Sequence, residues 1–128
     1  MLFRSVGVEG DAGLVARARR NAELNGLANA SFQVANLFDA EAGQSAFQGG
    51  YTRVLLDPPR AGALEVLPRV AATGAPRIVY VSCHPGTLAR DVGVLCHDLG
   101  YRLQSAGVID MFPHTNHVES MAILERAR

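Results

Sequence analysis

The stretch Arg77-Ile-Val-Tyr-Val-Ser-Cys-His-Pro-Gly-Thr-Leu-Ala-Arg-Asp91 decides the fold of this chain. Its apolar first part, Arg77–Ser82, is rich in β-branched residues and predicts a strand. Pro85 stands where proline is tolerated in the first turn of a helix, and we expect that helix to cover about Gly86–Leu99. A strand that leads directly into a helix is typical of a mostly parallel sheet with helices on its faces.

The alternation of strands and helices continues on both sides of this stretch. Upstream we predict a strand at Val6–Glu9, a helix at Ala12–Asn25, strands at Ser31–Ala35 and Thr52–Asp57, and a helix at Leu64–Ala72. Asp11 can cap the first helix and Gly26 can end it. Downstream, strands at Tyr101–Asp110 and Val118–Leu124 flank a short loop, which predicts an antiparallel hairpin closing the sheet.

Composition limits the possible classes of function. The chain has 128 residues, 48% of them apolar and 19% charged, so we expect one globular domain over residues 1–128 that is short for a complete α/β enzyme. No apolar run is long enough to cross a bilayer, which argues against a membrane role. Twelve basic residues balance twelve acidic ones, so much of the contact with an RNA partner would have to come from outside this chain.

The two cysteines, Cys83 and Cys96, are too few for a disulfide framework and lack the paired spacing of a metal site. Because residues 1–5 also lack a signal-peptide cleavage site, we expect a cytoplasmic protein. Cys83 follows a predicted strand and precedes a predicted helix, whose positive end favours the thiolate. This predicts a nucleophile at Cys83. The alternative, a small buried apolar side chain, is our expectation for Cys96.

Polar residues follow the predicted strands, and in open α/β sheets ligands bind at the carboxyl ends of strands. Glu9 can accept hydrogen bonds from ribose hydroxyls or simply lie in solvent, and Asn36 follows the next strand. Asp57 ends an apolar strand that we expect to be buried, where a carboxylate needs a partner. The two prolines after it form either a stiff slot for a flat ring or a tight turn. Arg60 then either binds phosphate or pairs with Asp57.

The stretch Phe112-Pro-His-Thr-Asn-His-Val-Glu119 gathers two histidines and a carboxylate. A metal site would need further ligands, and because no other His/Cys cluster is visible we expect no metal in this chain. His114 and His117 fit orienting hydrogen bonds in the loop. Glu119 enters an apolar strand, where a partly buried carboxylate suits proton abstraction.

Three stretches together resemble the hallmark motifs of the RNA uracil-5 methyltransferases. They are Leu55-Leu-Asp-Pro-Pro-Arg-Ala-Gly62, Val81-Ser-Cys-His-Pro-Gly-Thr-Leu-Ala-Arg-Asp91 and Asp110-Met-Phe-Pro-His-Thr-Asn-His-Val-Glu119. The resemblance covers nearly the whole chain after Ser5 and is strongest to the bacterial branch that acts on 23S ribosomal RNA; a sister branch acts on transfer RNA. It implies a Rossmann-like methyltransferase fold, S-adenosylmethionine as cofactor and RNA as partner.

The resemblance also implies the reaction. Cys83 would add to carbon 6 of uracil and make carbon 5 nucleophilic, so that carbon 5 can take a methyl group. Glu119 would then remove the proton from carbon 5 and allow the thiolate to leave.

The same carry-over implies binding roles. Glu9 would hold the ribose of the cofactor, Asn36 would contact its adenine side, and Asp57 would line the pocket that cofactor and uracil share. The target base must be unstacked to reach a thiolate, so a structured RNA loop is the expected substrate. The candidate RNA contacts are Arg60, Phe112 and His117, with Phe112 as the stacking partner.

The chain also departs from the family pattern. The first motif, a strand and a Gly-rich turn that cradle the cofactor, would lie before residue 1, as would an RNA-binding barrel and the iron–sulfur cluster of some members. We therefore expect a partial fold, in which the sheet is interrupted or closes up between the strands that end at Glu9 and Asp57. Its open edges would favour association. His84 stands where the family usually has Asn.

Three other readings stay open. One is a transfer RNA uracil-5 methyltransferase. Another is a methyltransferase for an exocyclic amine, which Asp57-Pro-Pro59 alone would fit and which needs no thiolate. The third is a fold fragment that binds no cofactor, and for the isolated chain we expect weak cofactor binding and no turnover.

Overall fold

The computed structural model describes residues 3–128, and the chain divides into two compact units, Met1–Gly49 (unit 1) and Gly50–Arg128 (unit 2). Each unit is described by itself. Our expectation of a single partial domain over residues 1–128 remains a prediction.

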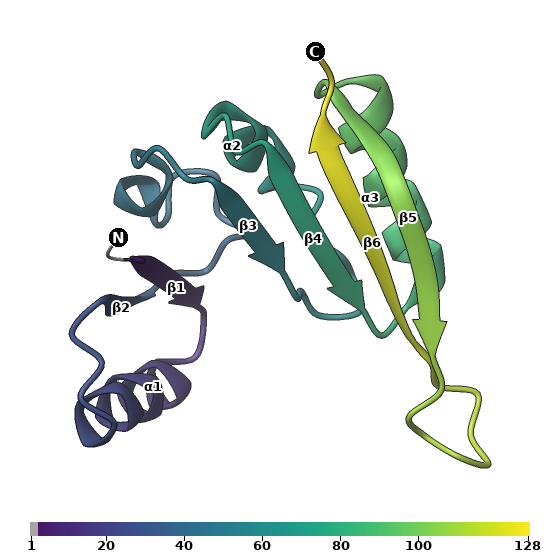
Figure 1. Ribbon diagram of the computed structural model, residues 1–128. Helices are drawn as coiled ribbons and strands as arrows, with labels where there is room; N and C mark the ends of the chain where they lie inside the picture. The colour runs from purple at the N-terminus through teal and green to yellow at the C-terminus, as the bar shows by residue number, and fades with distance from the viewer. Residues whose placement is uncertain (1–2) are drawn as a thin grey trace. The chain divides into compact units, whose positions relative to one another are not determined.

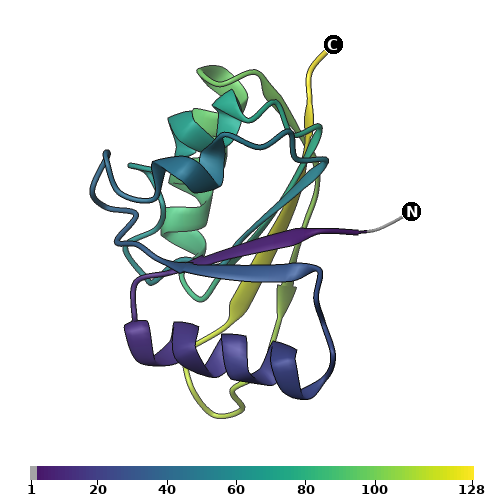
Figure 2. The same cartoon turned by 90° about the vertical axis from the view of Figure 1, so that its left-hand side faces the viewer.

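Unit 1 is a strand, a helix and a second strand parallel to the first (Figure 1). Its elements are β1 (Ser5–Glu9), α1 (Ala12–Leu24), β2 (Ala30–Val34) and the short 3-10 helix η1 (Gln44–Phe47). Figure 2 shows α1 running alongside the two paired strands. The strands and α1 agree with the sequence prediction to within a residue or two, whereas η1 was not predicted.

Local sequence explains where α1 begins and ends. The Asp11 Oδ1 atom accepts a hydrogen bond from the Leu14 amide at 2.9 Å, which makes Asp11 the N-cap. Gly26 follows the helix with a φ of +64°, a conformation that glycine adopts without strain. Val15 and Ala22, two turns apart, are the buried side chains of α1. Both predicted helix boundaries are therefore confirmed.

Unit 2 is a four-stranded sheet with two helices. Its elements are β3 (Arg53–Leu56), α2 (Leu67–Ala72), β4 (Arg77–Ser82), α3 (Pro85–His97), β5 (Tyr101–Ile109) and β6 (Glu119–Arg126). The strand order is β3-β4-β6-β5; β3 runs parallel to β4, and β6 runs antiparallel to both of its neighbours. The predicted hairpin is therefore present, and its second strand lies inside the sheet (Figure 1).

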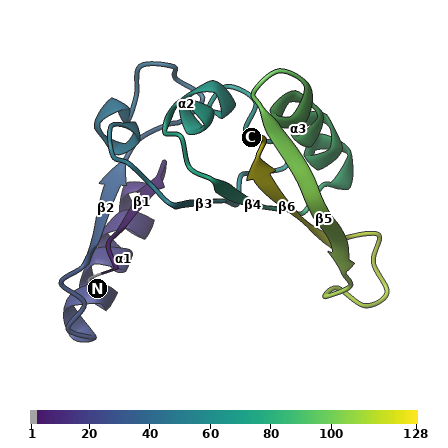
Figure 3. The ribbon, with the colours of Figure 1, turned by 45° about the horizontal axis from the view of Figure 1, so that its top comes forward.

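The core of unit 2 lies between the sheet and its helices. Both α2 and α3 cover the same face of the sheet (Figure 3). Alternate side chains of the two inner strands are buried, namely Ile78 and Tyr80 of β4 and Ala122 and Leu124 of β6. Leu95 of α3 is buried as well. The packing of these side chains fixes α3 against the sheet. It therefore also fixes the junction between β4 and α3, which contains Cys83.

The described strands form two separate sheets instead of one, which confirms the predicted interruption between the strand that ends at Glu9 and the strand that leads to Asp57. The prediction of a buried strand before Asp57 is wrong. Leu55 of β3 is 69% exposed, because it pairs with Val79 and so lies on the face of the sheet opposite the buried Ile78 and Tyr80. No helix within residues 3–128 has the length and apolar character needed to span a bilayer.

Candidate functional site

Cys83 lies between the end of β4 and the start of α3, half-buried and not in a disulfide. The backbone on either side of it is fixed. The buried Ser82 hydroxyl oxygen accepts a hydrogen bond from the His84 amide at 3.0 Å, and the His84 Nδ1 atom accepts one from the Thr87 amide at 3.1 Å. His84 is thus the N-cap of α3, a role that its ring nitrogen fills in place of an Asn side chain. The thiol stands directly before the N-terminus of α3.

Glu119 is brought to Cys83 by the pairing of β4 with β6. These strands are antiparallel, and their last paired residues are Ser82 and Ser120. The Ser120 hydroxyl donates to the Ser82 carbonyl oxygen at 2.9 Å, and both side chains are buried. Cys83 and Glu119 are the next residues beyond this pair, and the register continued by one step would set them opposite each other. Because paired strands are about 5 Å apart, a pyrimidine ring could be reached by both groups from this position.

Arg60 and His117 come from two loops that meet at this end of unit 2. The Arg60 Nη1 atom lies 3.4 Å from the His117 Nδ1 atom, which links the turn after β3 to the loop between β5 and β6. Within the described residues Arg60 forms no ion pair with Asp57, so that alternative for Arg60 is not supported. Asp57 itself is exposed, in contrast to the expected buried carboxylate. Phe112 lies in the same loop as His117 and is 43% exposed.

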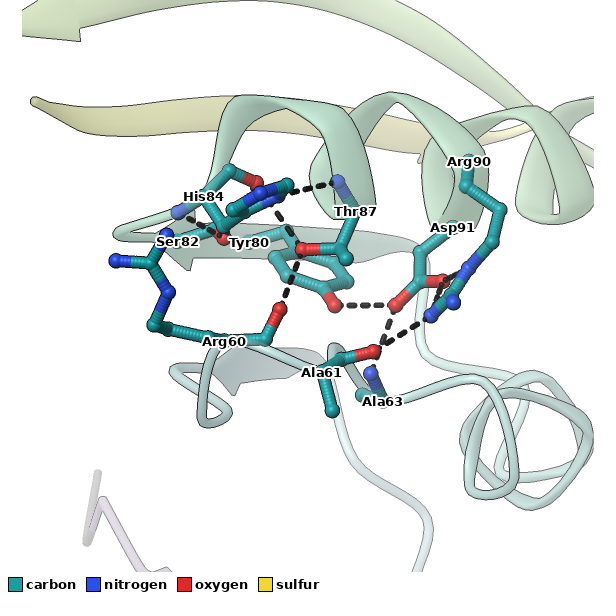
Figure 4. Close-up of polar contacts among 9 residues, drawn as sticks. All are labelled: Arg60, Ala61, Ala63, Tyr80, Ser82, His84, Thr87, Arg90 and Asp91. Carbon is teal, nitrogen blue, oxygen red and sulfur yellow. Dashed lines mark hydrogen bonds and ion pairs between the residues drawn. The ribbon is translucent and has the colours of Figure 1, made fainter.

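The sequence analysis missed a buried polar network around Asp91, shown in Figure 4. We call it the Asp91 network; it comprises Tyr80, Thr87, Arg90, Asp91 and the loop residues Arg60–Ala63. Asp91 is fully buried, and its Oδ2 atom accepts hydrogen bonds from the Ala63 amide at 2.7 Å and the Tyr80 hydroxyl at 2.5 Å. Its Oδ1 atom accepts a hydrogen bond from Arg90 Nε at 2.8 Å and forms an ion pair with Arg90 Nη2, also at 2.8 Å. Both oxygens of the buried carboxylate therefore have partners.

The Asp91 network connects two of the motifs that the sequence analysis singled out. Arg90 Nη2 also donates to the Ala61 carbonyl oxygen at 2.8 Å. The Thr87 hydroxyl lies 3.0 Å from the Arg60 carbonyl oxygen and 3.1 Å from the His84 carbonyl oxygen, and it can donate its one proton to either. Three α3 side chains therefore hold three residues of the loop after Asp57. A signal for this was present in the sequence, since Asp91 shares the apolar face of α3 with Leu88 and Leu95 and a charged residue there needs buried partners.

Tyr80 is kept in its donor form by its surroundings. Burial, together with the hydrogen bond to the Asp91 carboxylate, raises the pKa of Tyr80 far above its ordinary value. The phenol therefore remains protonated at neutral pH and keeps donating to Asp91. This supports a structural and permanent network, in contrast to one that titrates in the physiological range.

In unit 1, Glu9 and Asn36 both lie at the carboxyl ends of the two paired strands, since β1 and β2 are parallel and Glu9 is opposite Val34. Both are exposed. The Glu9 Oε1 atom accepts from the Asp11 amide at 3.0 Å, and the Asn36 Oδ1 atom accepts from the Phe38 amide at 3.1 Å. Within the described residues no hydrogen bond reaches the second carboxylate oxygen of Glu9, which leaves it able to accept from a ligand hydroxyl. Residues 3–128 hold no cluster of three or more His, Cys, Asp or Glu side chains suited to a metal ion.

Known structures share this fold. A precorrin-6y C5,15-methyltransferase from Geobacter metallireducens matches with a TM-score of 0.72 and 16% identity, over 96% of this chain and 67% of that one. An rRNA methylase from Streptococcus thermophilus matches with a TM-score of 0.68 and 10% identity, over 98% of this chain and 74% of that one. At this level of identity the similarity shows a methyltransferase-type α/β fold and nothing about the substrate.

Curated relatives are much more similar in sequence. A Stenotrophomonas maltophilia protein named 23S rRNA (uracil(1939)-C(5))-methyltransferase RlmD is 59% identical over 121 residues, which is 94% of this chain and 27% of the relative. The protein of the same name from Alkalilimnicola ehrlichii is 63% identical over the same shares of the two chains. The chain thus spans about a quarter of the length of these relatives. The sequence model of the family described as tRNA (Uracil-5-)-methyltransferase matches residues 15–127, and the chain belongs to this family.

Proposed function

We propose that this chain carries the catalytic residues of an S-adenosylmethionine-dependent enzyme that methylates carbon 5 of a uridine in 23S ribosomal RNA. The observation that carries the proposal is the Ser82–Ser120 pair, the last pair between β4 and β6, because Cys83 and Glu119 are the residues that adjoin it in the chain. The membership of the family and the names of the relatives support the same reaction class.

In the proposed reaction, Cys83 acts first. Its thiolate adds to carbon 6 of the uracil ring, and the electron pair of the carbon 5–carbon 6 double bond moves toward carbon 5 and the neighbouring carbonyl. S-adenosylmethionine, when bound, supplies an electrophilic methyl group. The buried Ser82 and the His84 cap hold the backbone on both sides of the thiol, so the sulfur approaches the ring from a fixed direction.

Glu119 completes the reaction. After methylation, carbon 5 carries both a proton and a methyl group, and the carboxylate removes the proton. The electron pair of the broken C–H bond restores the double bond and expels the Cys83 thiolate. Both residues are used once in each turnover, and both are regenerated when the proton leaves Glu119 for solvent.

The binding roles are proposals residue by residue. In unit 1, Glu9 would hold the ribose hydroxyls through its free oxygen, and Asn36 would contact the adenine side. In unit 2, Asp57 would face the sulfonium cofactor and the uracil. Arg60, His117 and the exposed ring of Phe112 would contact RNA, with Phe112 stacking on an unstacked base. Methylation of transfer RNA is the second candidate. The description of the family favours it, but the relatives at 59% and 63% identity are named for 23S ribosomal RNA.

The test uses a chimera, because the chain spans 27% of the length of its relatives. In the chimera, the matched residues of this chain replace their counterparts in the Stenotrophomonas maltophilia protein. RNA that contains 5-fluorouridine should form a covalent adduct with the chimera, and Cys83→Ala should abolish it. Cys96→Ala is the matched control and should retain it. An adduct that persists in Cys83→Ala would refute the nucleophile, and unchanged methylation would favour a methyltransferase that needs no thiol.

The base is tested separately. With ordinary uridine RNA, Glu119→Gln should methylate carbon 5 and then stall, so that methylated RNA stays attached to the protein and is visible on a denaturing gel. Glu65→Gln, at an exposed position, is the control and should release its product normally. Normal release by Glu119→Gln would show that another group removes the proton.

A further inference from the structure

We infer that the Asp91 network positions the loop after Asp57 relative to Cys83, and that Thr87, Arg90 and Asp91 are positioning residues for the proposed reaction. The network itself is seen in the structure. Its role in catalysis rests on the proposed function. None of these three side chains is required by the chemistry assigned to Cys83 and Glu119.

The geometry joins the two sides of the site through one rigid element. The N-cap of α3 directly follows Cys83, so the helix and the thiol share a fixed backbone. The same helix holds the loop through three consecutive attachments, at the carbonyl oxygens of Arg60 and Ala61 and the amide of Ala63. The distance between Cys83 and the Arg60 backbone is therefore set by α3 and not by the loop itself.

The loop is shaped to fit this attachment. Gly62 has a φ of +87°, and a Cβ atom placed there would lie 2.6 Å from both the Arg90 Nη2 and the Asp91 Oδ2 atoms. Only glycine allows the loop backbone to come this close to the ion pair. The Gly62 amide donates to the Pro59 carbonyl oxygen at 2.9 Å, which closes the turn on the side that carries Asp57. A methyl side chain at position 62 would therefore disrupt the contact between the loop and α3.

Asp91 is fully buried, whereas the side chain of its partner Arg90 is 45% exposed. A buried carboxylate needs its hydrogen-bond donors in place, so these bonds fix where the donors lie. Arg90 supplies a planar fork in which Nε bonds to Asp91 and Nη2 bonds to the Ala61 carbonyl oxygen. A lysine has a single nitrogen and lacks this fixed geometry. The half-buried Thr87 adds a hydrogen bond from its hydroxyl to the Arg60 carbonyl oxygen of the same loop. Small displacements of a reacting group lower rates strongly, so a loop that is released by even 1 Å should slow the reaction with little effect on folding.

The catalytic readout uses the chimera and the matched pair Thr87→Val and Thr87→Ser. Valine has the same shape as threonine without the hydroxyl donor, whereas serine keeps the donor. We expect Thr87→Val to slow adduct formation with 5-fluorouridine RNA by about tenfold at saturating RNA. The melting temperature should stay close to that of the parent. Thr87→Ser should restore the rate to within about twofold. A full rate in Thr87→Val would overturn the inference, because a purely structural threonine would leave the rate unchanged.

The second readout needs no activity and uses this chain itself. Asp91→Asn keeps the size of the side chain but replaces one acceptor by a donor, so it cannot satisfy Ala63, Tyr80 and Arg90 together. Amide hydrogen exchange at Ala63 should become about tenfold faster while the exchange of β6 amides, which report the sheet, changes less. Unchanged exchange at Ala63 would overturn the inference.

The two readouts separate the failure of this inference from the failure of the proposed function. If the parent chimera forms no adduct, the proposed function fails, and the exchange of Ala63 in Asp91→Asn then decides alone whether α3 holds the loop. If the parent reacts and Thr87→Val reacts equally well, the proposed function stands and the positioning role falls.

Discussion

In unit 1, Glu9 and Asn36 each bond to a backbone amide two residues away. In unit 2 the residues around Cys83 combine such local bonds with partners 27 to 38 positions away in the sequence. The cores differ in the same sense. Unit 1 buries Val15 and three alanines, whereas unit 2 buries large side chains from both helices and from β4 and β6. Geometry in unit 1 is therefore local, and geometry in unit 2 depends on the whole sheet and its helices. This difference predicts that the two sets of candidate residues respond differently to mutation.

The largest difference is expected from the two cores. Leu124 is fully buried on β6, and Leu124→Ala should lower the unfolding free energy of unit 2 by about 3 to 4 kcal/mol through lost burial and an unfilled cavity. Val15→Ala in α1 removes less apolar surface and should cost unit 1 about 2 kcal/mol. Urea unfolding read by amide exchange within each unit measures both. Equal losses would show that the cores are alike.

Alanine substitutions at two glycines with similar backbone angles test the Asp91 network. Gly62 and Gly74 have φ values of +87° and +74°, but only at Gly62 would a Cβ atom collide with other side chains. Gly74→Ala should cost about 1 kcal/mol of backbone strain. Gly62→Ala should cost about 2 kcal/mol more, because Arg90 and Asp91 must move. Thermal unfolding of the two variants gives the comparison, and a similar loss in both would show that the network yields without cost.

Tyr80 should make the stability of unit 2 sensitive to alkaline pH. Burial and the bond to Asp91 raise its pKa in the folded state, so its contribution is complete below the unfolded value of about 10 and is lost as pH rises from there through the folded pKa. The unfolding free energy of the parent should fall above pH 10 more steeply than that of Tyr80→Phe, by up to about 1.4 kcal/mol per pH unit. Chemical denaturation between pH 8 and 11 provides the measurement. Parallel curves would contradict the assignment.

The smallest effects are expected at the helix caps, which are local in both units. Asp11→Ala should cost about 1 kcal/mol, since the Leu14 amide loses its acceptor. His84→Asn places a residue that N-caps prefer at the start of α3 and should leave stability unchanged or raise it by up to about 0.5 kcal/mol. Melting temperatures give both values. A clear loss in His84→Asn would mean that the ring has a role besides accepting from Thr87.

Features that depend on local patterns could be predicted from the sequence. The strand Arg77–Ser82, the helix after Pro85 and the cap at Asp11 were all predicted and are present, because periodicity, a first-turn proline and a short acceptor side chain act over a few residues. The hairpin of β5 and β6 was predicted for the same reason. The placement of β6 between β4 and β5 was not, since strand order depends on contacts between distant segments.

The site shows the same division. Cys83 was predicted at a strand-to-helix junction from local sequence, and the structure places it there. The roles of Cys83 and Glu119, and of the binding residues in both units, stay predictions until they are tested. The exposure of Leu55 could not be predicted from composition, because it depends on which face of the sheet the helices cover. The burial of Asp91 could not be predicted either, because it depends on partners as far away as Ala63, 28 positions earlier.

The position of β6 has a consequence for how the protein is made. β6 is the last strand of this chain to leave the ribosome, yet β4 and β5 are neighbours of β6 and not of each other. While translation has not reached Glu119, the edge of β4 stays open and the thiol has no carboxylate opposite it. A nascent chain would therefore carry the proposed nucleophile without its proposed base, and the two would be brought together only when β6 inserts between its neighbours.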